Sequence, residues 1–388
     1  MRTVLVAGAA LFCFASVALA EAVNICGLGP SGEICGVSPL GEANNTPGAN
    51  GAAADSAQTC TCTNVKITGK ATEDCDEAED RAELSGVVVD KDKTRLIAIA
   101  NEGFGPGKRD HALQIFEGDL AQGYVFKKDI TLFEVPNNFC NEADFEGLTT
   151  RDGDLFAITS HSRDRKKQAD DSSYDENRKR LTAKGFSGCP WRYQLKQFRL
   201  NDSDKVSVVK EVNLLAMIVS DPVLAPFVAL PNKENGIDIE GLAATESGLY
   251  VGFKGPVLRQ NYVPVLRLNR ELLPVPSEPN PLFVKLGGRG IRDLTAAPDG
   301  ENLYILAGPN GDEAQSFAIY FWDGKDQVGG ADREVSKPDK RCDLGTFDDV
   351  KPEGIAHLGS DAGEDRFLLI FDGGRRPTAR ILTLKRTD

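Results

Sequence analysis

Several residue types that carry common chemistry are scarce in this 388-residue sequence. It contains three histidines, two methionines and two tryptophans. No histidine stands near the cysteines at zinc-finger spacing, and the run Cys60-Thr61-Cys62 is CxC, a weak redox motif compared with CxxC. The GxSxG frame of a nucleophile elbow is also missing around Ser160-His161-Ser162. The sequence therefore offers no motif for structural zinc, thiol redox or Ser-elbow hydrolase chemistry.

Long apolar runs are absent after the first twenty residues, so no later segment is expected to cross a membrane. The start of the chain has Arg2, an apolar stretch and the small-residue site Ala18-Leu19-Ala20. This order is typical of a secretory signal peptide. We expect residues 1–20 to be removed after Ala20 and the mature protein to be periplasmic or secreted.

The chain is acidic, with 58 acidic and 45 basic residues and a formal net charge of −13. A negative surface repels phosphate backbones and anionic lipids. Neither nucleic acid nor a membrane is therefore expected as a partner. Charge alone leaves the oligomeric state open.

Eight cysteines remain after the signal peptide, and an even number in an exported chain favours disulfides. Residues 21–62 are rich in small and polar residues and read as a flexible, disulfide-stapled arm. Within this arm, Cys26 and Cys35 would close a short Gly-rich loop.

From residue 63 to 388, short apolar runs alternate with turn residues, which is typical of an all-β protein. One unit recurs five times: an inner strand, a tight polar turn and a strongly apolar second strand. Its anchor positions are Gly86, Gly147, Gly241, Asp293 and Gly354. The repeats predict a five-bladed β-propeller. A six-bladed form is the alternative, because the long second interval holds an insertion at about 163–188 and a helix-like stretch at 214–230.

The fifth unit is one strand short, and the segment Asn64-Val-Lys-Ile-Thr68 is the expected donor. We expect this N-terminal strand to pair with Ile381–Leu384 and to close the ring, which hides the edges of the first and last blades.

In such a blade, the start of the inner strand and the end of the antiparallel second strand meet at one mouth of the central channel. The inner-strand starts carry Glu146, Glu240, Arg292 and Glu353. The second-strand ends carry His161, Arg163, Lys254, Asn310, Asp372 and Arg375. The insertion leaves from the same side and could cover the mouth, which would bring Cys140 and Cys189 together as a disulfide.

These side chains suggest two chemistries. His161, Glu146 and Glu240 are candidates for acid–base catalysis. The remaining mouth residues are candidates for binding a polar or anionic ligand, with carboxylates able to hold a divalent cation such as Ca²⁺. A structural role is the alternative: each Glu could accept hydrogen bonds from a neighbouring blade, and Arg292 could pair with Glu240 or Glu353.

Four motif pairs are similar to those of a bacterial family of exported propellers of unassigned function. They are Asp144-Phe-Glu-Gly-Leu with Ser160-His-Ser-Arg163, Asp238-Ile-Glu-Gly-Leu with Lys254-Gly-Pro, Gly290-Ile-Arg-Asp-Leu with Ala307-Gly-Pro-Asn-Gly311, and Pro352-Glu-Gly-Ile with Asp372-Gly-Gly. The chain also distantly resembles the esterase-like, phytase-like propellers. The resemblance implies a propeller in a periplasmic or secreted setting, and it carries phosphoester hydrolysis only as an analogy.

Together, the sequence predicts an exported propeller that binds a polar or anionic small molecule at its mouth. A metal-assisted phosphoester or ester hydrolase is the enzymatic version of this hypothesis. The alternative from another class is a non-catalytic scaffold or protein-binding propeller.

Overall fold

The computed structural model describes residues 60–68, 83–103, 109–136, 140, 142–183, 188–275, 280–311, 313–347, 350–373 and 378–386. All of them belong to one compact unit, Glu33–Asp388. The expected signal peptide, the Cys26–Cys35 pair and Arg375 lie outside the described residues. Within the described ranges, no helix combines the length and the apolar character needed to cross a bilayer.

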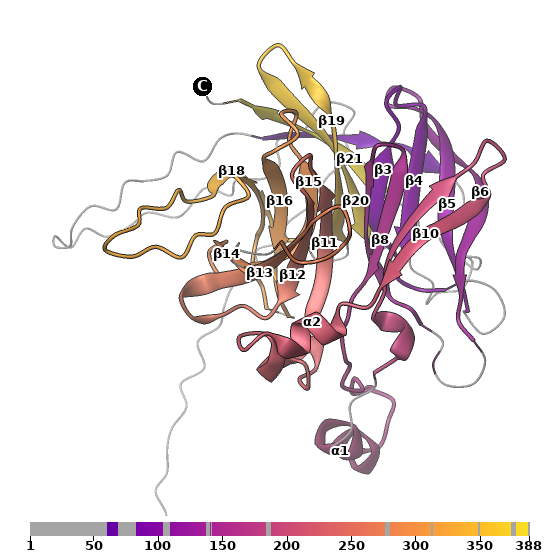
Figure 1. Ribbon diagram of the computed structural model, residues 1–388. Helices are drawn as coiled ribbons and strands as arrows, with labels where there is room; N and C mark the ends of the chain where they lie inside the picture. The colour runs from indigo at the N-terminus through magenta and orange to yellow at the C-terminus, as the bar shows by residue number, and fades with distance from the viewer. Residues whose placement is uncertain are drawn as a thin grey trace, which may run out of the picture. The chain divides into compact units, whose positions relative to one another are not determined.

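The described strands form five sheets, one for each predicted repeat (Figure 1). Blade one comprises β3 (Leu84–Val89), β4 (Arg95–Ala100), β5 (Asp110–Asp119), β6 (Gly123–Glu134) and the short β2 (Ile67–Thr68). Blade two comprises β7 (Phe145–Arg151), β8 (Asp154–Thr159), β9 (Leu195–Leu200) and β10 (Val206–Val212).

The other three blades repeat this antiparallel order from the inside outward. Blade three comprises β11 (Asp238–Ala244), β12 (Leu249–Gly255), β13 (Tyr262–Leu268) and β14 (Leu282–Lys285). Blade four comprises β15 (Gly290–Ala296), β16 (Leu303–Gly308), β17 (Phe317–Trp322) and β18 (Asp339–Gly345). Blade five comprises β19 (Lys351–Asp361), β20 (Glu364–Asp372), β21 (Thr378–Lys385) and β1 (Thr61–Val65).

Helices occupy the long interval between the second and third anchors. The insertion contains α1 (Tyr174–Thr182), which begins with a Ser173–Glu176 capping box. The helix-like stretch contains α2 (Leu215–Ser220) and a 3₁₀ turn at Ala225–Phe227. The same interval contains two further 3₁₀ turns, at Pro190–Arg192 and Asn232–Glu234. Another 3₁₀ turn follows in blade three, at Arg259–Asn261. The described part of this interval holds no additional sheet, so the five-bladed prediction is confirmed and the six-bladed alternative is wrong.

The five inner strands close into a ring. Each contacts the inner strands of its two neighbours, and β19 returns to β3, as Figure 1 shows for the yellow and indigo sheets. The predicted N-terminal closure is confirmed, but its register differs: β1 pairs with β21 through Thr61↔Thr383 to Val65↔Ala379. The following residues, Ile67–Thr68, pair in parallel with β6 of blade one instead. One short segment therefore ties the last blade to the first.

The apolar core lies between neighbouring sheets. Leu242 and Ile305 share one cluster across blades three and four, whereas Phe317 and Ile355 share another across blades four and five. Burial of one such side chain stabilises the fold by about 1.5–3 kcal/mol. This alternation of sheet and apolar layer holds the ring together.

Each inner strand carries a β-bulge directly before its anchor residue. The register with the second strand shifts across Ser85, Glu146, Glu240, Arg292 and Glu353. A bulge bends the strand and re-aims a side chain. At the anchor itself the next blade comes very close: a Cβ on Gly147 would lie 2.7 Å from the Leu242 Cβ and 3.0 Å from the Glu240 carbonyl oxygen. Only glycine permits that approach.

Substituting Gly147 with Ala should therefore lower the free energy of unfolding by about 1–3 kcal/mol, because the new methyl group overpacks the contact with blade three. Urea denaturation checks this value. Gly188→Ala is the matched control, since its nearest atom would be the Tyr193 hydroxyl at 3.4 Å. Equal stability of the two variants would contradict the close-packing argument.

The disulfide between Cys60 and Cys342 joins the residue before β1 to β18 of blade four, with Cα atoms 5.9 Å apart. It closes a very long loop, so its loss should release conformational entropy in the unfolded chain. The double variant Cys60→Ser/Cys342→Ser should lose about 2–5 kcal/mol of stability. Thermal unfolding without reductant measures the loss. An unchanged midpoint would mean that β1 holds the closure without the covalent link.

Candidate functional site

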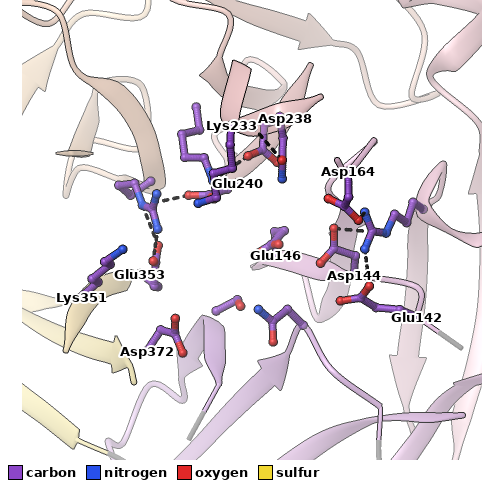
Figure 2. Close-up of a pocket in the computed structure, with 16 residues that line it drawn as sticks. Glu142, Asp144, Glu146, Asp164, Lys233, Asp238, Glu240, Lys351, Glu353 and Asp372 are labelled. Atoms are coloured by element: carbon purple, nitrogen blue, oxygen red, sulfur yellow. Dashed lines mark hydrogen bonds and ion pairs between the residues drawn. The ribbon is translucent and has the colours of Figure 1, made fainter. Parts of the chain in front are cut away.

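The starts of the inner strands and the ends of the second strands meet in one cavity of about 300 Å³, called the mouth below. Six of the predicted site residues line it: Glu146, Glu240, Arg292, Glu353, Lys254 and Asp372. Ser85 and Asn101 of blade one complete this part of the wall. Figure 2 shows these side chains converging from all five blades. The bulges place one residue of every inner strand in the same wall.

Other predicted site residues lie elsewhere. His161 is buried and does not line the mouth; its Nδ1 is 2.8 Å from the Thr159 carbonyl oxygen, and its ring packs edge-on against Tyr193. Burial lowers the pKa of His161 to about 4, so the imidazole is neutral at physiological pH. Arg163 and Asn310 also lie outside the lining and hold a neighbouring turn, as described below.

A chain of ion pairs crosses blades three to five. The Lys254 amine lies 2.6 Å from the Asp238 carboxylate and also contacts Glu240. The Arg292 Nε lies 2.9 Å from Glu240 and 2.7 Å from Glu353. Arg292 therefore pairs with both glutamates that the sequence offered as partners, and the two cations offset part of the charge of the three buried carboxylates.

The surroundings of these ion-paired groups shift their pKa values. Burial is the largest influence and disfavours the charged amine, but Asp238 and Glu240 outweigh it and raise the pKa of Lys254. Burial raises the pKa of Asp238 to about 6, although Lys254 opposes the shift. Lys254 thus keeps its charge at neutral pH.

A second cluster surrounds Arg192, which follows the insertion. Its guanidinium contacts Glu142 and Asp164 and lies 3.5 Å from Asp144. The predicted disulfide Cys140–Cys189 is confirmed, with Cα atoms 5.8 Å apart. Because Cys140 is two residues before Glu142 and Cys189 three residues before Arg192, the disulfide holds both ends of the cluster together.

Glu146 stands between the two clusters (Figure 2). Burial, followed by the charges of Asp144 and Glu240, raises its pKa well above the ordinary value. Its neighbour Asp144 is different: burial disfavours its charge, but Arg192 and hydrogen bonds from Ser160 and Glu146 outweigh burial and lower its pKa. The opposite directions favour a hydrogen bond from the acid form of Glu146 to the carboxylate of Asp144.

Metal binding was also expected at the mouth. Among the described residues, no group of three or more His, Cys, Asp or Glu side chains is arranged to hold a metal ion. Glu240 and Glu353 are already held in ion pairs, Glu240 with Lys254 and Arg292 and Glu353 with Arg292.

Several lining residues escaped the sequence analysis, namely Glu142, Asp144, Asp164, Arg192, Asn232, Lys233, Asp238 and Lys351. Strand periodicity could have found three of them. Asp144, Asp238 and Lys351 each stand two residues before a predicted glutamate, and alternate residues of a strand share a face. Arg192 and Lys233 lie on 3₁₀ turns and carry no such signal.

Several solved structures resemble the chain at low similarity. A glucose dehydrogenase is 14% identical over 79% of this chain and 83% of its own, with a TM-score of 0.38. An exo-1,5-α-L-arabinanase from a bovine ruminal metagenomic library is 10% identical over 79% and 95%, with a TM-score of 0.41. A mannose phosphorylase from Leishmania mexicana is 10% identical over 83% and 87%, with a TM-score of 0.38.

No curated protein matches the sequence. A family model described as "Protein of unknown function (DUF3616)" matches residues 122–381. This match covers blades two to four, most of blade five and the strand β6 of blade one, which is well over half of the sequence. The protein therefore belongs to the DUF3616 family.

Proposed function

We propose that the mouth binds a small, neutral molecule rich in hydroxyl groups. The observation that carries this proposal is that the lining is almost entirely polar while its most buried cations are already paired with carboxylates. A hydroxyl group both donates and accepts hydrogen bonds, so it can match carboxylates, amines and the Asn101 amide in one cavity. A cavity of about 300 Å³ suits a molecule of the size of a monosaccharide or smaller.

The charge of the lining supports a neutral ligand over an anionic one. Eight carboxyl groups and five basic groups line the mouth among the described residues. Three of these cations, Lys254, Arg192 and Arg292, are held in ion pairs with less than a tenth of each side chain exposed. An incoming phosphate or carboxylate would have to break those pairs and leave buried carboxylates unpaired, which is costly.

The same contacts bear on the hydrolase version of the function. Metal-assisted phosphoester hydrolysis would need Lys254 and Arg292 to offset developing negative charge, and His161 to act near the ligand. Both cations are paired with acids, and His161 lies outside the lining. A binding role for a neutral molecule therefore fits the described geometry better.

We also propose that the protein works outside the cytoplasm. Two disulfides, Cys60–Cys342 and Cys140–Cys189, stabilise the described residues. Such bonds persist in oxidising compartments. They support the export that the first twenty residues predict.

Binding can be tested by thermal unfolding with D-glucose and myo-inositol as neutral probes and D-glucuronate as a matched anion. A neutral probe should raise the midpoint by mass action, equivalent to about 2.7 kcal/mol at one hundred times its Kd, and D-glucuronate should not. Glu146→Ala should weaken the binding up to roughly tenfold through loss of a hydrogen-bond donor, whereas Glu146→Gln retains a donor. The control is Glu117→Ala on strand β5 of blade one, with 58% of that side chain exposed. A response to D-glucuronate but to neither neutral probe would refute the proposal.

The titration of Glu146 gives a second prediction. Its raised pKa means that the folded state keeps a proton which the unfolded chain releases, so this residue's contribution to stability falls as pH rises. The amide introduced by Glu146→Gln has no such proton. Urea denaturation between about pH 5 and about pH 8 should therefore show Glu146→Gln gaining stability relative to the parent protein as pH rises. Parallel profiles would show that Glu146 is already ionised in the fold.

A further inference from the structure

The ion-pair clusters do not include every amine of the mouth. Lys233 lines the mouth from the 3₁₀ turn Asn232–Glu234 (Figure 2). It keeps a large part of its surface exposed. No carboxylate of the described residues lies within ion-pair distance of its amine, in contrast to Lys254. Lys233 is thus a basic group that a ligand in the mouth can reach.

The turn that presents Lys233 is fixed from three blades. The Asn232 N–H donates to the Arg163 carbonyl oxygen at 2.8 Å, and Glu234 forms an ion pair with Arg165 of the insertion. The Asn235 side-chain oxygen accepts from the Val257 N–H at 2.8 Å and from the Asn310 amide at 2.7 Å. These contacts give the predicted residues Arg163 and Asn310 a positioning role for the turn.

Neighbouring cations shift the titration of Lys233 toward the neutral amine. The charge of Lys254 is the largest cause, followed by burial and by Arg292, and together they lower the pKa of Lys233 although Asp238 and Glu240 oppose them. Lys254 itself stays charged because Asp238 and Glu240 hold it. An amine beside a second, permanently charged cation is the usual arrangement of a nucleophilic lysine.

The same cavity supplies a proton donor. Glu146 lines the mouth beside Asp144, and burial together with the charge of Asp144 raises the pKa of Glu146 and so favours its carboxylic acid form. Condensation of an amine with a carbonyl group needs a proton for the departing hydroxyl group, and a neutral acid near the ligand provides it.

We propose that Lys233 forms an imine with a hydroxy-aldehyde or open-chain reducing sugar bound in the mouth. This inference rests on the proposed function and narrows its ligand to carbonyl compounds. The neutral amine attacks the carbonyl carbon, and a proton moves from nitrogen to oxygen to give a carbinolamine. Glu146 then protonates the hydroxyl group, which leaves as water while the C=N bond forms. The proton still on nitrogen returns to Glu146, so one water is released and the acid is restored.

The test uses the full chain with D-glyceraldehyde as the carbonyl probe and cyanoborohydride to reduce the imine to a stable amine. Peptide mass spectrometry then compares the rate of modification at Lys233 with that at Lys325, a lysine with 79% of its side chain exposed. At neutral pH we expect Lys233 to react faster than Lys325, because a lowered pKa leaves more of the amine in its free form. Equal rates at the two lysines would overturn the inference.

Two variants separate the chemistry from a structural effect. Lys233→Arg should abolish the fast modification and leave the rate at Lys325 and the unfolding midpoint unchanged. Glu146→Gln should slow modification of Lys233 and leave Lys325 unaffected; an unchanged rate at Lys233 would remove Glu146 from the mechanism. Glycerol, which has the same carbon skeleton without the carbonyl, distinguishes the two proposals. Stabilisation by glycerol or a sugar without selective modification rejects the imine alone, whereas absence of both rejects the binding site as well.

Discussion

The close packing of the five inner strands around the channel is the constraint on which the rest of the structure depends. Glycine at four anchors lets the neighbouring blade approach, since a Cβ on Gly241, for example, would lie 2.7 Å from Ile291. In blade four, Asp293 takes this place and accepts N–H groups from Ile355 and Leu294. Its carboxylate thereby links blades four and five. The bulge before every anchor then directs one side chain per blade to the mouth.

This convergence crowds charge into a small volume, and the described contacts show how the fold tolerates it. Three inner-strand glutamates in one cavity would repel one another. Arg292 in place of a fourth glutamate, together with Lys254, pairs with two of them. The third, Glu146, has no basic partner as close, and its surroundings raise its pKa and so favour the protonated acid. In the resulting polar cavity, neither the Glu146 carboxyl group nor the Lys233 amine forms an ion pair with another described residue.

The described part of the insertion in blade two adds a residue to the wall of the mouth and no further strand to the blade. Arg192 gathers Glu142, Asp144 and Asp164, and the Cys140–Cys189 bond fixes the two chain segments that carry this cluster. The sequence could pair these cysteines because both flank the same face of a predicted blade. It could not find Arg192, because no period of two or 3.6 marks a residue on a 3₁₀ turn. The position of His161 was predicted wrongly for a related reason. The residue follows the end of β8, which indicates a place at the mouth, but the His161 side chain turns back toward the Thr159 carbonyl group.

From the sequence alone, the five repeats, their anchors, the ring closure and six mouth residues follow, because strand alternation and turn residues are local properties that repeat with the blade. The exact register of β1, the ion-pair partners and the position of Lys233 do not follow. They depend on which side chains from separate blades come within a few ångströms of one another, and on the pKa shifts that this proximity causes. Only the tertiary structure decided those contacts, since electrostatic interactions act through space and not along the chain.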